Sequence, residues 1–194
     1  MRVRTVIGCA CVAGLGVMGA SMAQQPSGGT EKPVVTLGEQ VEGALAKLDW
    51  LVGEFEAKGT FGGPKPDGTR DEQKGTWKNE RVLGGRHLRM TFDVEVASRR
   101  VEYWCVLSWN PREGVYETTW TGSSGYRFSE TGTYDEGKRA LTLVSHQPGA
   151  DGELEEVTSV FRQGVNGEIT VTDSKKGEDG KDVVTFYVEL RRKK

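Results

Sequence analysis

The side chains that most often carry out catalysis or bind metals are few in this sequence. It contains two histidines, His87 and His146, which are far apart and belong to no cluster with the spacing of metal ligands. Cys105 lies in an apolar segment without a cationic or histidine neighbour, which indicates a buried hydrophobic residue rather than a nucleophile. A Ser-His-Asp triad is spatial and stays open, although the sequence has no nucleophile elbow, phosphate loop or His-Glu-x-x-His motif. We therefore name no catalytic residue and expect no cofactor and no metal.

Arginine is the residue best suited to hold a carboxylate inside an apolar site, because its guanidinium can donate two parallel hydrogen bonds. Arg89 shares an alternating face with Asp93, and Arg127 is out of phase with Phe128, so we expect both arginines to face solvent. Arg86 is in phase with the apolar face of its strand but begins that strand beside a turn. A position at the rim and an inward position are both open for Arg86.

Aromatic and large apolar side chains form the other candidate group, since alternation places many of them on inward strand faces. Such side chains, with a few polar anchors, are typical of a ligand pocket. The same residues at strand spacing would equally make an ordinary barrel core, so the sequence is compatible with a hollow or a filled interior. The candidates for lining a cavity are Met90, Phe92, Tyr103, Trp109, Trp120, Phe128 and Arg86.

A change of hydrophobic period near residue 50 organises the chain. Val41, Ala44, Leu45 and Leu48 have the spacing of one buried helix face, whereas residues 54–61 alternate as a strand with one wet face does. The pattern predicts a helix that leads into the first strand of a sheet.

The rest of the chain has the pattern of β-strands separated by turn residues, at the spacing of an all-β sandwich or barrel. The strand at 99–109 carries Trp104 and Val106 on its second face, which predicts that it is covered on both sides. The predicted strands are 55–61, 71–82, 86–96, 99–109, 115–121, 126–134, 139–147, 153–163, 169–174 and 182–192.

Short turns between these strands favour an all-β fold with up-and-down order. We predict a closed antiparallel barrel of about ten strands with the N-terminal helix over one end, because closure removes both sheet edges. A two-sheet sandwich is the alternative, and it would need Greek-key connections that short turns disfavour.

The N-terminus has the composition of a targeting segment. Arg2 and Arg4 precede an apolar run at 5–20, and Ser21-Met22-Ala23 fits a signal peptidase site. We predict a signal peptide at 1–23, a flexible linker at 24–36 and a single domain at 37–194, in a protein exported to the periplasm or secreted.

Charge excludes two classes of partner. The formal net charge is −2 and both signs are interspersed, so neither a nucleic-acid footprint nor a polybasic membrane patch is expected. The cationic run at 191–194 indicates a solvated tail. After signal cleavage we expect no membrane span, and a small apolar ligand is the expected partner.

Four motifs carry a resemblance to a known family: Leu48-x-x-Leu51-Val52-Gly53-x-Phe55, Val82-Leu83-Gly84-Gly85-Arg86-His87-Leu88, Trp109-Asn110 and Tyr116-x-x-x-Trp120. They resemble the bacterial domain-of-unknown-function family 1579 over essentially the whole domain. The resemblance implies a calycin-type, lipocalin-like barrel, with Phe55 where the family usually has Trp, and it implies no activity or catalytic residue.

The opening also resembles nitrobindin, a haem-binding barrel with a histidine ligand near its C-terminus. No histidine follows His146, so this resemblance does not extend to haem.

Three functions are compatible with this sequence. The preferred one is non-catalytic binding of a small apolar or amphipathic molecule in a dry barrel cavity whose mouth lies near the helix at 37–50. An enzyme of the same barrel, a hydrolase or isomerase on an apolar substrate, would need at least two titratable groups converging inside. A protein-interaction module would instead expose an apolar patch around Trp104 and Val106.

Overall fold

A computed structural model describes residues 35–149 and 152–194. The predicted signal peptide, and the predicted linker up to residue 34, lie outside these described residues. Helix α1 (Leu37–Ala46) is followed by a 3₁₀ turn (Asp49–Leu51) and then by strands. The strands are β1 (Gly53–Phe61), β2 (Asp71–Val82), β3 (His87–Val96), β4 (Arg99–Asn110), β5 (Val115–Gly122), β6 (Arg127–Asp135), β7 (Ala140–Pro148), β8 (Leu154–Gln163), β9 (Ile169–Lys176) and β10 (Asp182–Arg192). Within the described ranges, no helix has the length and hydrophobicity needed to cross a bilayer.

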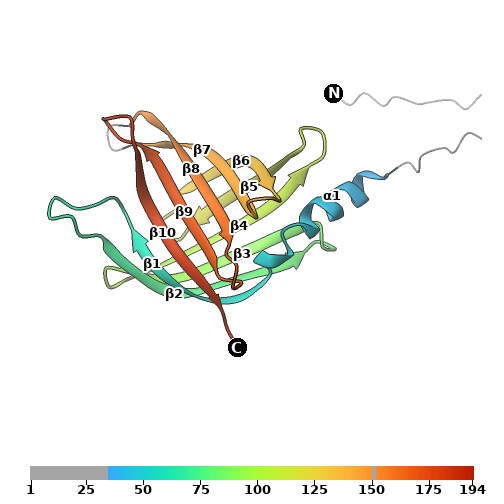
Figure 1. Cartoon of the computed structure of the whole chain (residues 1–194), viewed down its shortest axis with the longest axis horizontal. Coiled ribbons are helices and arrows are strands. Elements are labelled where there is room, and N and C mark those ends of the chain that lie inside the picture. The colour runs from blue at the N-terminus through green and yellow to red at the C-terminus, as the bar shows by residue number, and fades with distance from the viewer. Residues whose placement is uncertain (1–34, 150–151) are drawn as a thin grey trace, which may run out of the picture. The chain divides into compact units, whose positions relative to one another are not determined.

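The ten described strands form one closed antiparallel barrel in up-and-down order (Figure 1). Each strand pairs with the next along the chain, and β1 pairs with β10 from Phe55↔Arg192 to Phe61↔Phe186. Every strand therefore has two neighbours, and no edge of the described sheet is left open. The predicted closed barrel of about ten strands with one helix is confirmed.

A capping box starts α1 at Thr36. The Thr36 hydroxyl accepts a hydrogen bond from the Glu39 backbone N–H at 3.2 Å, and the Glu39 carboxylate accepts one from the Thr36 N–H at 2.7 Å. Two of the N–H groups that a helix start leaves unpaired are thus satisfied. The Thr-x-x-Glu motif at 36–39 therefore determines where the helix begins.

The apolar face of this N-terminal segment closes one end of the barrel. Leu45, Leu48 and Leu51 are each at most 1% exposed. The Tyr116 hydroxyl donates a 2.7 Å hydrogen bond to the Ala44 carbonyl at the end of α1, which ties β5 to the helix. This end is filled by side chains, and the adjoining half of the interior is packed core that includes Leu88, Leu107, Leu141, Leu143, Ile169 and Leu190.

Glycines allow neighbouring strands of the barrel wall to approach closely at three positions. A Cβ atom on Gly59, Gly75 or Gly132 would lie within 2.2 Å of a backbone carbonyl oxygen on a neighbouring strand. These positions therefore require the residue that lacks Cβ.

The second apolar face of β4 is not covered, so the prediction that this strand is covered on both sides was wrong. Trp104 points outward and is 49% exposed, between Thr91 of β3 and Thr121 of β5. Val106, the next outward residue of β4, lies between Arg89 and Thr119 and is partly buried. In a closed barrel with one short helix over its end, an outward face has solvent as its neighbour.

Candidate functional site

The other half of the barrel interior holds a cavity of about 260 Å³. Phe61, at the end of β1, and Tyr126, just before β6, are 39% and 38% exposed at its mouth. Both lie at the barrel end opposite to the end that α1 closes. The prediction that the mouth lies near the helix was wrong. The buried side chains of Leu45, Leu48 and Leu51 fill that end of the barrel.

Aromatic rings from several strands make the wall of the cavity. Trp120 lies 5.1 Å from Phe92 and 5.9 Å from Phe128 between ring centroids, and the indole is stacked on the Phe128 ring at 12°. Tyr126 continues this series towards the mouth, with its ring centroid 5.6 Å from that of Phe128. Trp77, in the cavity lining, is 1% exposed and its indole N–H has no hydrogen-bond partner among the described residues.

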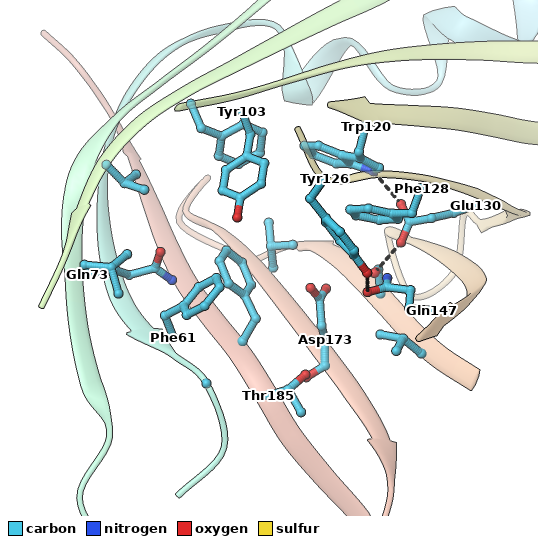
Figure 2. Close-up of a pocket in the computed structure, with 18 of the residues that line it drawn as sticks. Phe61, Gln73, Tyr103, Trp120, Tyr126, Phe128, Glu130, Gln147, Asp173 and Thr185 are labelled. Atoms are coloured by element: carbon cyan, nitrogen blue, oxygen red, sulfur yellow. Dashed lines mark hydrogen bonds between the residues drawn. The ribbon is translucent and has the colours of Figure 1, made fainter. Parts of the chain in front are cut away.

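Tyr103 reaches the cavity because a glycine faces it on the next strand. Tyr103 of β4 is in register with Gly122 of β5, and a Cβ atom on Gly122 would lie 2.6 Å from the phenol ring. The Tyr103 hydroxyl is directed into the cavity (Figure 2). Burial, and then the nearby Tyr126 phenol, raise the pKa of Tyr103, so this hydroxyl stays a hydrogen-bond donor at neutral pH.

Glu130 of β6 is a carboxylate buried in the cavity wall at 2% exposure. It accepts three hydrogen bonds, from Trp120 Nε1 at 2.7 Å, Thr118 Oγ1 at 2.9 Å and Ser159 Oγ at 2.6 Å. All three neighbours donate, as an ionised carboxylate requires. Glu130 is therefore fixed in place by side chains from β5 and β8.

Asp173 of β9 is the second carboxyl group, and its carboxylate is directed into the cavity (Figure 2). Burial, and next the charge of Glu130, raise the pKa of Asp173 to about 7, while the neighbouring Ser159 hydroxyl acts in the opposite direction. Near neutral pH this group can therefore exchange a proton or hold a charge at small cost. Such a group can bind the polar end of a molecule or transfer a proton to it.

The amide side chains of the lining are engaged with their surroundings. Gln73 donates from Nε2 to the Thr60 and Tyr187 carbonyls at 3.0 and 3.1 Å, which links β2 to β1 and β10. Gln147 accepts a 3.0 Å hydrogen bond from the Tyr126 hydroxyl and donates to Ser145 Oγ at 2.8 Å. Both amides are therefore occupied within the protein. Because Glu130 is also held by its three hydrogen bonds, Asp173 is the carboxyl group of the lining that can meet a ligand.

The structure places four of the seven predicted cavity residues around this space: Phe92, Tyr103, Trp120 and Phe128. Met90, Trp109 and Arg86 do not line it. Met90 is fully buried in the packed half, and Trp109 lies beside Tyr116 near the helix, with ring centroids 4.7 Å apart. Arg86 lies at the helix end too, where it faces Glu42 at 3.5 Å. All three belong to the barrel end that the helix closes.

The remaining polar candidates lie away from the cavity. Arg89 pairs with Glu80 on the outer surface, and Arg127 is exposed. His146 is exposed with Nε2 4.0 Å from a Glu156 oxygen. Cys105 is fully buried, and burial raises the pKa of its thiol. Among the residues that the structure describes, no group of three or more His, Cys, Asp or Glu side chains could hold a metal ion.

Sequence reasoning missed both carboxyl groups. The signal was present, since Glu130 is in phase with Phe128, and Asp173 with Ile169 and Val171, all inward residues. An acidic residue in the inward phase of a strand can lie inside the barrel as part of a polar site. It can equally show that the strand no longer alternates regularly, in which case the side chain faces solvent. A single sequence is compatible with both.

Comparisons with known proteins identify a family. A search of curated proteins gives no match. Among solved structures, the chain is similar to a protein described as a "De novo design of a fluorescence-activating beta barrel", with 15% identity, a TM-score of 0.38, and coverage of 75% of this chain and 95% of that one. The family described as "Protein of unknown function (DUF1579)" matches residues 44–192. Since this match spans most of the sequence, the chain belongs to the DUF1579 family.

Proposed function

We propose that this barrel is an exported binding protein that holds a small apolar or amphipathic molecule in its cavity without carrying out chemistry on it. The observation that carries the proposal is the cavity itself, about 260 Å³ in volume, walled by aromatic rings and open at the end opposite α1. Its volume is just below the range of about 300–1,000 Å³ typical of ligand pockets. A ligand of one or two rings would suit it.

The energetics of such binding are favourable for two reasons. Covering apolar surface gains roughly 25 cal/mol per Å², and the aromatic wall offers a contiguous surface of this kind. The wall is also built on strands of a closed barrel, so that little conformational entropy is lost when a ligand enters a preformed site.

Native mass spectrometry of the protein purified from its own host tests the proposal. We expect a small co-purifying mass that is present in the native spectrum and absent after denaturation. In Val157→Trp the new indole would occupy the cavity, so the bound mass should disappear, whereas Thr158→Trp adds the same side chain to the outer face of β8 and should keep it. Equal ligand loading of both variants, each folded, would reject binding in this cavity.

Export is a separate part of the proposal. Its support is the charged start, the apolar run at 5–20 and the small residues at 21 and 23. The expected result is a mature chain that begins at Gln24 and is found in the periplasm or the medium, as measured by the intact mass after fractionation. A chain that keeps Met1 and stays in the cytoplasm would contradict it.

A second candidate function is proton transfer to an apolar substrate, and the convergence of Glu130 and Asp173 on one cavity favours it. Asp173, with a pKa of about 7, has the protonation behaviour of a general acid or base at neutral pH. We would measure deuterium uptake from heavy water into an apolar cyclic ketone by NMR. Uptake above the uncatalysed rate that is lost in Asp173→Asn supports an isomerase, and uptake at the uncatalysed rate rejects this activity.

A further inference from the structure

Among the described residues, the cavity lining carries acidic side chains without basic ones, and this imbalance bears on the charge of the ligand. Glu130 and Asp173 both belong to this lining, whereas the described lining residues include no Lys, Arg or His. Two carboxyl groups in a space of low dielectric repel one another, and an opposite charge placed between them is strongly favoured.

Two cationic side chains near the cavity, Lys175 and Arg70, contact other groups. Lys175, on the same face of β9 as Asp173, donates to Glu155 at 2.6 Å. Arg70 directs its guanidinium to the carbonyl oxygens of Gly62 and Val184. Neither side chain belongs to the cavity lining, so the carboxyl groups inside are not neutralised by them.

The other groups that face Asp173 are neutral. Ser159 lies opposite on β8, Tyr103 and Tyr126 present their phenols from β4 and from the turn before β6, and Thr185 donates to the Asp173 backbone carbonyl at 3.4 Å. Glu130 is thus the charged group of the described lining that Asp173 meets.

The aromatic faces of the cavity also favour a cation. Trp120, Phe128 and Phe92 line the same cavity as the two carboxyl groups, and the negative face of an aromatic ring attracts a cation placed over it. An anionic ligand would meet two carboxyl groups, and a neutral apolar ligand would cover the Asp173 carboxylate without supplying an opposite charge.

We infer that the cavity takes a small apolar molecule that carries one protonated amine. The ammonium lies beside the Asp173 carboxylate, and the apolar body lies against the rings of Phe92 and Trp120. This inference rests on the proposed binding function and adds the charge of the ligand to it. Glu130 has a supporting role. Its three hydrogen bonds hold the side chain in the cavity wall, and its negative charge adds to the attraction for the ammonium group.

Three probes that share a naphthalene ring and differ in charge test this inference: 1-naphthylmethylamine, 1-naphthylmethanol and 1-naphthoate. Each is titrated by calorimetry into the mature protein. The protein is first denatured and refolded to remove any bound molecule. Near pH 8 we expect the amine to bind at least roughly tenfold more tightly than the alcohol, and the carboxylate to bind most weakly. From about pH 8 to 5 the affinity for the amine should fall as Asp173 takes up a proton, while that for the alcohol should change little.

Two variants locate the effect. Asp173→Asn should remove most of the preference for the amine, whereas Asp182→Asn removes an exposed carboxylate at the same barrel end and should leave it unchanged. Binding of the alcohol with no preference for the amine would overturn the inference and leave the proposed binding function standing. Failure of all three probes to bind would count against both.

Discussion

Ser159 Oγ donates a 2.6 Å hydrogen bond to Glu130 Oε1 and lies directly opposite Asp173 in the ladder between β8 and β9. One hydroxyl thus stands beside two carboxyl groups but has a single proton to donate. Because that proton is directed to Glu130, Asp173 receives less stabilisation of its charged form. The unequal hydrogen bonding of the two groups follows from this arrangement.

Asp173→Asn should stabilise the fold at alkaline pH. The folded-state pKa of about 7 is above the ordinary value of 3.8, so the folded protein binds the proton more tightly than the unfolded chain. Stability therefore falls as pH rises from about 4 to 7, and the full cost is present above that range. In urea unfolding we expect the variant to gain roughly 1–4 kcal/mol at about pH 8 and close to nothing at about pH 4.

The control for this prediction is Asp182→Asn, which removes an exposed carboxylate paired with Lys176 and should change stability by less than about 0.5 kcal/mol at either pH. A gain for Asp173→Asn of the same size at both pH values would mean that the titration of Asp173 is not its source.

Removal of Glu130 should destabilise the barrel more than removal of an exposed acid. Glu130→Ala leaves the donors of Thr118, Trp120 and Ser159 without an acceptor in a buried place, and we expect a loss of about 3–5 kcal/mol. Glu130→Gln keeps one acceptor oxygen and should lose about 1–2 kcal/mol.

Glu156→Ala is the matched control, because Glu156 is exposed on the outer face of β8 and its loss should stay within about 0.5 kcal/mol. The measurement is denaturant unfolding followed by tryptophan fluorescence, and the emission of Trp120 should change in both Glu130 variants. Equal losses for Glu130→Ala and Glu156→Ala would show that the buried hydrogen bonds contribute little.

Much of the fold could be predicted from the sequence, because the evidence for strands is local. Turn residues such as Asn166-Gly167 and the alternation of Leu88, Met90 and Phe92 determine strand positions within a few residues of the structure. Closure of the sheet into a barrel could be predicted because a long open meander would leave two strand edges unpaired.

The location of the cavity could not be predicted in the same way. Alternation distinguishes inward from outward residues, which is why Phe92 and Trp120 were found, but it does not say which barrel end is filled. Met90 and Trp109 share the inward phase and lie at the other end. That difference depends on the three-dimensional fit of the helix leucines into the barrel, which is not a local property.

Tyr116→Phe should loosen α1 from the barrel. The phenol donates a 2.7 Å hydrogen bond to the Ala44 carbonyl, and its loss should cost about 1 kcal/mol while the packing of the ring on Trp109 remains. We expect faster hydrogen exchange of the amides at 37–46, and no such change in Tyr187→Phe, whose side chain is on the outer face.

Spectrophotometric titration of the tyrosines gives a second measurement on the same variant. Burial raises the pKa of Tyr116 to about 12, with smaller contributions from Tyr134 and Glu136. The phenolate signal that appears near this pH should be missing in Tyr116→Phe. A titration curve identical to that of the parent protein would contradict the assignment.

A pair of glycine substitutions should change stability in opposite directions. Gly132→Ala would place a Cβ atom 1.8 Å from the Thr142 carbonyl oxygen and 2.8 Å from the Leu143 Cα, so β6 and β7 would have to separate. Both obstacles are backbone atoms that no side-chain rotation can remove, and we expect a loss of at least about 3 kcal/mol.

Gly43→Ala, on the exposed face of α1, meets no atom within 4 Å and should gain roughly 0.5–1 kcal/mol, because alanine has less conformational freedom to lose in a helix. Thermal unfolding followed by circular dichroism measures both changes, and a Gly132→Ala variant as stable as the parent would mean that the wall at β6 and β7 is not held as closely as the structure describes.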